Sequence, residues 1–506
     1  MPIYKDHSFR SGASAAAGAD SVYEISQSIR FNDNDTTYMS RTPSSASNRK
    51  TWTWSAWCKR GHITDSDNGN MFCTYGGGSA FSGIRWETTT QNDTLFIFDF
   101  NGSSFGYQLH TTQVFRDPSA WYHIVFAFDS TESVSSQRAR LYINGQRVTD
   151  FRTESYPTLN YDSYTNNNQL TVIGASNSGS YNEHLDGYLA EIHFLDGYAY
   201  GPEYFGTTNS SGIWIPIDYD TETGNYGTNG FKIDGSDSAT LGKNVASGNT
   251  YASYTSSGLA AHDQVLDTPN NNFAVINSIY STRTTSGAGS THTVENGNLF
   301  QQADSYSTSN YGTRPFTVQP LNRGKWYFEC EPNIEAGSGN ILALVVTEES
   351  NFYANPGAQN TDRYGMLASL YDGTLYFAYG SSSRQETNSP IPAHGDIIGT
   401  AIDFDNAKIY FFVNGTEIHG QTIASGTAAT NLSGWSTSNN WIINFYTSTA
   451  SNNSNRGNVL FNFGQEGTFA GTQTAGGNSD SNGMGNFKHS VPSGYLALCT
   501  RNLFTG

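Results

Sequence analysis

The chain has 506 residues, enough for about three average domains or two β-domains of roughly 200–250 residues each. Only 14% of the residues are charged, whereas 31 Tyr, 30 Phe and 9 Trp can build a large core, so the composition excludes a coiled coil, a helical bundle and a disordered chain. The net charge of −18 and the lack of a Lys/Arg cluster in the sequence exclude nucleic acid as a partner, because binding it requires a basic surface.

Residues 1–21 are the first segment, and they show neither strand alternation nor a helical apolar stripe. Their only apolar run, Ala15–Ala17, is far shorter than the roughly 7–15 apolar residues of a secretory signal peptide. We therefore expect an extended N-terminal segment on a chain that is made in a cytoplasm. An ordinary frayed terminus is the alternative interpretation.

Strand patterns follow over residues 22–235. Residues 95–100 form an alternating run, and alternate residues of 121–129 place large apolar side chains on one face. Residues 139–143 alternate in the same way, and Asn144-Gly145 then predicts a hairpin with a type I′ turn, because both residues tolerate positive φ. This half of the chain predicts an antiparallel β-domain.

Residues 236–285 lose the alternation and predict an irregular connector. Residues 286–506 repeat the earlier pattern, with strands over 396–405 and 408–413 and a second hairpin turn at Asn414-Gly415. No helical periodicity exceeds two turns. The predicted fold class is all-β, with two tandem antiparallel β-sandwiches.

The four cysteines, Cys58, Cys73, Cys330 and Cys499, lie far apart and form no CxxC pair. Apolar neighbours favour buried free thiols over metal ligands or a disulfide framework. No apolar stretch reaches the roughly 18 residues of a membrane-spanning segment, so we expect no membrane insertion.

The sequence gives little support for a catalytic function. The nearest approach to a glycosidase carboxylate pair is the group Glu183, Asp186 and Glu191, but the odd spacing of the last two sends them to opposite faces of a regular strand. There is no Gly-x-Ser-x-Gly elbow and no HExxH pair. His123 and His193 lie in predicted strands, where structural, hydrogen-bonded histidines are the favoured interpretation. We expect no enzyme, no catalytic residue and no organic cofactor.

Calcium is the one ion that the sequence leaves open. Residues 32–35 are rich in carboxylate and amide oxygens, which Ca²⁺ prefers, and Asp33 and Asp35 are the candidate ligands. Asp and Asn also favour turns for conformational reasons alone, so a turn without metal is the alternative.

Three Gly/Ser-rich segments with aromatic residues have the composition of recognition loops, namely 75–81, 178–183 and 379–384. Aromatic rings can stack on the C–H faces of sugars, and the same residue types make adaptable protein-binding loops. The composition therefore predicts ligand binding without separating glycan from protein. The candidate ligand-binding residues are Tyr75, Phe81, Tyr181, Tyr379 and Arg384.

The first half resembles a laminin-G-like, or concanavalin A-like, jelly roll over about residues 22–205. The resemblance rests on four segments in the expected order, Ser28–Asp33, Trp121–Phe126, Leu141–Gly145 and Leu185–Phe194. Because such domains sometimes bind Ca²⁺ at the rim of the sandwich, the resemblance agrees with the candidate calcium ligands.

The second half resembles a SPRY-type β-sandwich. The segments that carry this resemblance are Gly324–Glu329, Gly395–Asp403, Ile409–Gly415, Val459–Gly464 and Pro492–Leu498.

The join between the halves is similar to that of virion proteins of tailed phages, especially aquatic phages. It is carried by Gly212–Pro216, Tyr226–Phe231 and Asp263–Phe273, together with the C-terminal Gly494–Thr500. The resemblance implies a phage structural protein, a tail fibre or another host-facing appendage, located in the virion. It also implies an oligomer, with a trimer favoured, that binds other virion proteins and a host-surface glycan or protein.

Phage fibres commonly attach by their N-terminal end, so the resemblance implies that residues 1–21 attach the chain to the virion by burying Tyr4 and Phe9 in a neighbour. Two other functions stay open, a capsid-decorating or tail-cementing structural protein and a polysaccharide depolymerase. The expected domains are this attachment segment, a jelly roll over 22–235, a connector over 236–285 and a SPRY-like sandwich over 286–506.

Overall fold

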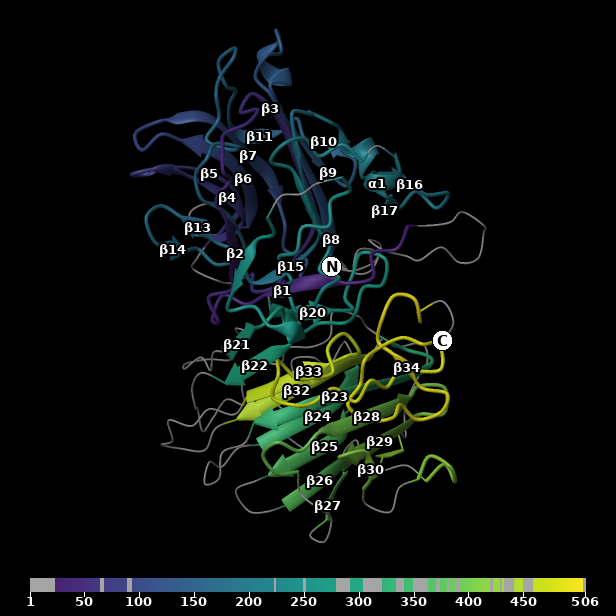
Figure 1. Cartoon of the computed structure of the whole chain (residues 1–506). Helices are drawn as coiled ribbons and strands as arrows, with labels where there is room; N and C mark the ends of the chain where they lie inside the picture. The colour runs from purple at the N-terminus through teal and green to yellow at the C-terminus, as the bar shows by residue number, and fades with distance from the viewer. Residues whose placement is uncertain are drawn as a thin grey trace. The chain divides into compact units, whose positions relative to one another are not determined.

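The fold was analysed in a computed structural model, and the fold class is confirmed as all-β (Figure 1). The structure describes residues 23–63, 68–88, 93–222, 224–248, 252–278, 292–303, 321–333, 341–348, 363–369, 374–379, 382–386, 392–418, 422–427, 430–431, 441–448 and 458–503. By its internal contacts the chain divides into two compact units, Met1–Asn272 and Phe273–Gly506. Residues 1–22, and with them Tyr4 and Phe9, lie outside the described residues.

The first unit contains two large antiparallel sheets. The β3 sheet has the order β10-β9-β8-β3-β15-β1-β20, with β18 paired to β15, and the β6 sheet has the order β11-β7-β6-β5-β4-β12-β2-β19. The strands of the β3 sheet are β1 (Ser28–Phe31), β3 (Thr51–Arg60), β8 (Trp121–Asp129), β9 (Ala139–Ile143), β10 (Gln146–Arg147), β15 (Gly187–Asp196), β18 (Phe231–Ile233) and β20 (Gln264–Val265). Those of the β6 sheet are β2 (Tyr38–Arg41), β4 (Gly69–Gly77), β5 (Ala80–Glu87), β6 (Thr94–Phe100), β7 (Phe105–Val114), β11 (Phe151–Ser155), β12 (Thr171–Ile173) and β19 (Thr255–Ser257).

Shorter elements decorate these sheets. They are the hairpin of β13 (Ser176–Asn177) and β14 (Tyr181–Asn182), the hairpin of β16 (Gly206–Thr208) and β17 (Trp214–Pro216), the single helical turn α1 (Tyr219–Glu222), and the 3₁₀ turns η1 (Ser135–Gln137), η2 (Pro202–Tyr204) and η3 (Ala261–Asp263). Among the described residues, no helix is long and apolar enough to cross a membrane.

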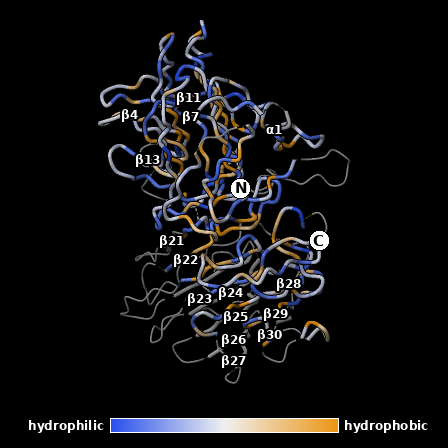
Figure 2. The backbone as a smooth tube through the Cα atoms, viewed as in Figure 1, coloured by the Kyte–Doolittle hydropathy of each residue, from blue (hydrophilic) through white to orange (hydrophobic). Residues whose placement is uncertain are grey.

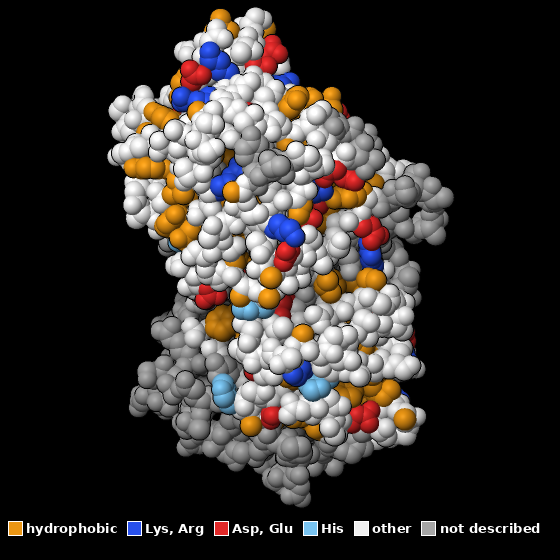
Figure 3. All heavy atoms as spheres, viewed as in Figure 1, with side chains coloured by type: hydrophobic (Ala, Val, Ile, Leu, Met, Phe, Trp, Pro, Cys, Tyr) orange, Lys and Arg blue, Asp and Glu red, His pale blue; other side chains and the backbone are white. Residues whose placement is uncertain are grey.

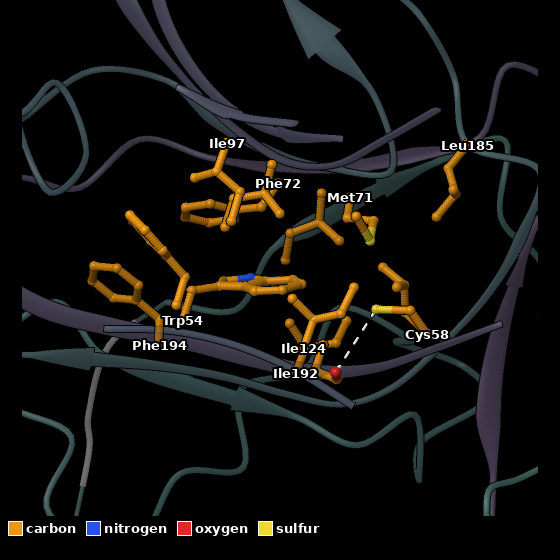
Figure 4. Close-up of a cluster of buried hydrophobic side chains, with 14 of the residues drawn as sticks. Trp54, Cys58, Met71, Phe72, Ile97, Ile124, Leu185, Ile192 and Phe194 are labelled. Atoms are coloured by element: carbon orange, nitrogen blue, oxygen red, sulfur yellow. Dashed lines mark hydrogen bonds between the residues drawn. The ribbon is translucent and has the colours of Figure 1, made fainter. Parts of the chain in front are cut away.

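The core of the first unit lies between its two sheets (Figure 4). Trp54 and Ile124 enter it from the β3 sheet and meet Phe72 and Ile97 of the β6 sheet. The alternation predicted for residues 121–129 is confirmed, because Ile124 and the residues two and four positions later are all buried in this core. Figure 2 shows the same pattern along the chain, with hydrophobic backbone segments inside the unit and hydrophilic ones at its loops. All four cysteines are buried free thiols, as predicted.

The first unit continues further along the chain than the expected boundary at residue 235. Residues 255–257 pair with β2 and residues 264–265 pair with β1, so the segment expected as a connector adds a strand to each sheet. Leu241 and Tyr254 also enter the core. Sequence patterns miss these strands because each is only two or three residues long and most of their residues are polar.

The second unit also contains two sheets, and their strand pairs are antiparallel except for one. The β28 sheet has the order β21-β22-β33-β23-β28-β29-β30, with β31 paired to β29 and β34 parallel to β23, and the β25 sheet has the order β27-β26-β25-β24-β32. Their bounds are β21 (His292–Glu295), β22 (Phe300–Ala303), β23 (Lys325–Asn333), β24 (Ile341–Glu348), β25 (Arg363–Ser369), β26 (Thr374–Tyr379), β27 (Ser382–Glu386), β28 (Ile398–Asp403), β29 (Lys408–Val413), β30 (Thr416–Glu417), β31 (Thr430–Asn431), β32 (Trp441–Ser448), β33 (Asn458–Asn462) and β34 (Leu496–Ala497).

A long irregular segment follows β33 and is anchored on the β28 sheet by buried carboxylates. Glu329 on β23 accepts hydrogen bonds from the backbone N–H groups of Lys488 and His489, both at 2.8 Å, and from the Tyr327 hydroxyl at 3.1 Å. Burial raises the pKa of Glu329 to about 7. A buried carboxylate of the sheet therefore holds the backbone of this segment in place.

Candidate functional site

The outer face of the β3 sheet is covered by the chain itself. Val125 and Leu195 on that face pack against Phe205, Tyr219 and Tyr226, which come from the segment after β15. Figure 1 shows α1, β16 and β17 on the outer side of β8, β9 and β10. This sheet therefore offers little surface to a ligand.

The outer face of the β6 sheet carries a different surface, which we name the aromatic row. Along β6, Leu95 and Ile97 point into the core, so the alternate residues point outward. The rings in contact on this outer face are Phe81, Phe96, Phe98, Phe100 and Phe105. Phe98 lies over Gly83 of the neighbouring strand, where a Cβ would come within 2.8 Å of the ring.

The row is most exposed to solvent at one ring. Phe96 and Phe98 are buried by their neighbours, with their ring centroids 4.6 Å apart, whereas Phe105 on β7 is 41% exposed. Phe81 and Phe100 are half-buried. Figure 3 shows hydrophobic side chains on the side of the first unit where Figure 1 labels β4 and β13. The row thus presents an apolar platform with an exposed ring.

Arg85 on β5 lies over the buried end of the row. Its guanidinium is 5.6 Å from the Phe96 centroid and 5.1 Å from the Phe98 centroid. Two carboxylates hold it: Glu87 accepts from Nη2 at 2.7 Å and from Nε at 3.1 Å, and Glu183 accepts from Nη1 at 2.9 and 3.0 Å. Charge-assisted bonds of this kind are strong and directional, so the cation is fixed in place.

Two amides complete this polar group, which we name the Arg85 cluster: Arg85, Glu87, Glu183, Asn68 and Asn70. The Asn68 and Asn70 side chains donate to Glu183 at 2.9 and 2.7 Å. The carbonyl oxygen of Asn70 is buried and has no hydrogen-bond partner among the described residues. Glu183 has a φ of +48°, a strained conformation for a residue with a side chain, and strain of this kind gathers at functional sites.

His110 on β7 lies beside Phe96, next to the Arg85 cluster. Its ring lies 4.8 Å from that of Phe96, and its Nε2 is 2.7 Å from the Thr94 hydroxyl oxygen. Burial lowers the pKa of His110, so the neutral ring is favoured. The site therefore combines apolar rings, one paired cation and several oxygen acceptors.

A pair of tyrosine rings joins β2 of the β6 sheet to the short β13-β14 hairpin. Tyr38 on β2 stacks on Tyr181 of β14, with ring centroids 4.0 Å apart and an interplanar angle of 19°. Tyr181 is 36% exposed. Cys73 and Val172 form a small apolar cluster with Tyr38 and Phe81, which links this pair to the aromatic row.

The structure places three of the five predicted ligand-binding residues along the β6 sheet. Phe81 belongs to the aromatic row, Tyr75 on β4 is its cross-strand partner and is half-buried, and Tyr181 belongs to the tyrosine pair. Tyr379 and Arg384 lie in the second unit, on β26 and β27, where the structure describes the backbone only.

Arg85, Glu183 and Asn70 could not be predicted as a group from the sequence. Arg85 and Glu183 are 98 positions apart, so only the fold brings them together. One signal was available in residues 95–100, where apolar residues occupy both faces of a strand. Such a strand must cover something on its outer face.

The three carboxylates weighed as a glycosidase group lie in different environments. Glu183 belongs to the Arg85 cluster, whereas Asp186 accepts a hydrogen bond from the His62 backbone at 3.0 Å. Glu191 sits in a β-bulge of β15 with a φ of +48° and bonds to Tyr23 at 2.8 Å and His193 at 3.1 Å. They do not form one group.

The two strand histidines are hydrogen-bonded, as predicted. His123 Nδ1 accepts from the Trp214 indole at 3.0 Å, and its Nε2 is 2.9 Å from the Ser55 hydroxyl oxygen. Burial lowers the pKa of His123 to about 3. His193 contacts Glu191 and, at 3.2 Å, the Tyr226 hydroxyl.

The candidate calcium ligands lie in the turn after β1. Asp33 Oδ1 accepts from the Asn34 backbone at 3.0 Å, and Asp35 accepts from the Asn32 amide at 2.7 Å. Within the described ranges, no three His, Cys, Asp or Glu residues are grouped as they would be to hold a metal ion.

Comparison with known proteins identifies the fold of the first unit. Residues 32–200 match the family model of the concanavalin A-like lectin/glucanases superfamily, so this part of the chain is a concanavalin A-like domain. No curated protein matches the chain.

Solved structures similar to the chain have low sequence identity. Domains LG4-5 of the mouse laminin α1 chain are 9% identical over 88% of this chain and 91% of that one, with a TM-score of 0.28. The heptameric SAP-like pentraxin of Limulus polyphemus is 16% identical over 35% of this chain and 80% of that one, with a TM-score of 0.27. The SPRY domain of human HERC1 is 16% identical over 34% of this chain and 91% of that one, with a TM-score of 0.23.

Proposed function

We propose that the chain is a carbohydrate-binding protein and that its first unit holds a saccharide on the outer face of the β6 sheet. The observation that carries this proposal is that an exposed ring, Phe105, and the Arg85 cluster lie against the same two rings, Phe96 and Phe98, on one face of the β6 sheet. Ligand sites typically combine apolar surface with a few fixed polar groups.

The chemistry of a sugar suits both parts of this surface. The face of an aromatic ring carries negative charge density, which attracts the polarised C–H groups on one side of a pyranose. Sugar hydroxyls donate hydrogen bonds to carboxylate and amide oxygens, and Glu183 and Asn70 supply both kinds. A saccharide can therefore stack on Phe105 while its hydroxyls reach the cluster.

Binding without hydrolysis is part of the proposal. A retaining glycosidase needs one carboxyl group that stays protonated near neutral pH. Glu87 and Glu183 instead both accept hydrogen bonds from the Arg85 guanidinium, so both carboxyl groups serve to hold this cation. We therefore assign them to binding and not to acid catalysis.

The biological setting is proposed from the sequence resemblance to phage virion proteins. In that setting the chain is an oligomeric, host-facing component of the particle. Many weak sugar sites held on one particle would act together and raise the overall affinity by avidity. No cofactor is part of this proposal.

Isothermal titration of the full chain against a glycan panel tests the function. For a glycan that the wild-type chain binds, Phe105→Ala should weaken the affinity about tenfold, because the exposed stacking surface is removed. This corresponds to about 1.4 kcal/mol of binding free energy. Val134→Ala is the matched control, since Val134 is a 54% exposed apolar residue in a loop outside the row. Equal affinities of the two variants, or new reducing ends in the incubated glycan, would contradict the proposal.

A further inference from the structure

We propose that the Arg85 cluster selects uncharged saccharides and discriminates against carboxylated ones. The inference rests on the proposed function and names the class of sugar that the same site takes. It follows from which hydrogen-bonding groups of the site are already used and which are left.

The cationic group of the site is already engaged. Arg85 directs hydrogen bonds from all three guanidinium nitrogens at Glu87 and Glu183, and its face lies against Phe96 and Phe98. Its side chain is only 14% exposed. A sugar carboxylate would have to displace one of these glutamates to gain the bidentate contact that makes arginine a carboxylate receptor.

The cluster also offers acceptors to a ligand. The Glu183 carboxylate accepts four hydrogen bonds from Asn68, Asn70 and Arg85 and keeps 24% of its side chain exposed, and the Asn70 carbonyl oxygen is buried without a partner among the described residues. A Cβ on Gly83 would lie 3.3 Å from this oxygen and 2.8 Å from the Phe98 ring, so the oxygen and the aromatic row border the same small patch of backbone. A hydroxyl supplies the donor that this oxygen lacks, and a carboxylate cannot.

The charge of the Arg85 cluster also disfavours a carboxylated ligand. The cluster holds two carboxylates and one guanidinium, so a ligand carboxylate meets excess negative charge in a partly buried place, where screening is weak. Arg152 on β11 is exposed and is not a member of the cluster. It is a cation that an acidic sugar could use instead of Arg85.

The experiment compares matched sugars on the full-length chain. The probes are methyl-esterified polygalacturonate against free polygalacturonate, and lactose against 3′-sialyllactose, within a wider panel of neutral and carboxylated glycans. Titrations at low and high salt separate local selectivity from the repulsion due to the net charge of −18. We expect the neutral member of a recognised pair to bind at least tenfold more tightly, with most of that ratio kept at high salt.

Glu183→Gln should release part of the Arg85 guanidinium and reduce this ratio about tenfold. Glu203→Gln is the matched control, because it removes the same charge at an exposed residue of η2. Circular dichroism and thermal melting establish that both variants are folded, and Arg152→Gln tests the alternative cation.

The outcomes separate the two proposals. Tighter binding of the carboxylated probe, especially if Arg152→Gln abolishes it, would overturn the selectivity and leave sugar binding standing. An equal drop in the ratio for Glu183→Gln and Glu203→Gln would overturn the role of the cluster. Absence of binding to every glycan of the panel would overturn the proposed function and this inference together.

Discussion

The turns at Asn144-Gly145 and Asn414-Gly415 show that the backbone conformation of single residues can be predicted from the sequence. Their φ angles are +47° and +77° in the first turn and +49° and +76° in the second, as a type I′ turn requires. Both glycines have a second reason to lack a side chain. A Cβ on Gly145 would be 2.5 Å from the Trp214 ring, and one on Gly415 would be 2.9 Å from His489 Nδ1.

Gly415→Val should therefore destabilise the second unit by more than the backbone strain alone. A side chain at positive φ costs about 1–2 kcal/mol, and the contact with His489 adds to it. Gly395→Val is the matched control, because Gly395 has a φ of +83° and no atom within 4 Å of its Cβ position. Thermal melting measures both, and an unchanged melting temperature for Gly415→Val would show that the turn is not under this constraint.

His123 makes the stability of the first unit depend on pH. Burial lowers the pKa of His123 to about 3, whereas an unfolded histidine titrates near 6.5. The unfolded chain therefore binds the proton first, and stability should fall as the pH drops from about 6.5 toward 3, by up to about 1.4 kcal/mol per pH unit. Asp99, whose pKa burial raises to about 6, acts with the opposite sign.

Because of this opposing group, the measurement is a difference between two proteins. Denaturant unfolding of wild type and His123→Gln across pH 4–8 should give curves that converge as the pH falls, since the variant lacks the histidine proton. Parallel curves would mean that His123 has the same pKa in the folded and the unfolded chain, against the effect of burial.

At the level of elements, the extension over residues 236–272 is fixed by buried ion pairs. Lys59 Nζ on β3 lies 2.6 Å from Asp267 Oδ2 and 2.7 Å from Asn272 Oδ1, and both charged side chains are fully buried. Removing one partner of a buried pair leaves a charge without compensation. The pair therefore ties the end of the extension to the middle of the β3 sheet.

Asp267→Ala should destabilise the first unit by about 3–5 kcal/mol, because Lys59 stays buried without its carboxylate. Asp237→Ala breaks the exposed pair with Lys243 in the same extension and should leave the unfolding midpoint unchanged. The double variant Lys59→Met/Asp267→Leu should recover much of the loss. Additive effects of the two substitutions would show that the charges do not act as a pair.

The elements also show what the sequence could and could not predict. Strands such as β8, β9 and β29 were predicted because their apolar residues alternate and a turn follows or precedes them. β19 and β20 were not, because pairing with distant strands rather than local pattern makes them strands. The Arg85 cluster was missed for the same reason, whereas Phe81 and Tyr181 were predicted as ligand-binding candidates from composition alone.

At the scale of the whole molecule, the contacts divide the chain after Asn272, and not after residue 235. The difference lies in what residues 236–272 contribute to the first unit. They supply core side chains at Leu241 and Tyr254, and they supply the carboxylates of Asp263 and Asp267. A domain boundary should lie where few such contacts cross it.

Fragments of the chain test this division. Residues 23–272 and 273–506, expressed separately, should each unfold in one cooperative transition, because each keeps the partners of its buried groups. Residues 23–235 should instead be insoluble or melt at a much lower temperature. In this fragment Arg30 loses Asp263 and Lys59 loses Asp267, while both cations stay buried in the β3 sheet. Adding residues 236–272 back to the fragment should restore the cooperative transition and its melting temperature. Substituting Asp267→Ala in the restored fragment should remove most of this increase in melting temperature. Residues 23–235 could instead melt as cooperatively and at the same temperature as residues 23–272. In that case residues 236–272 would not be needed for the stability of the first unit, and its buried ion pairs would not hold the core together.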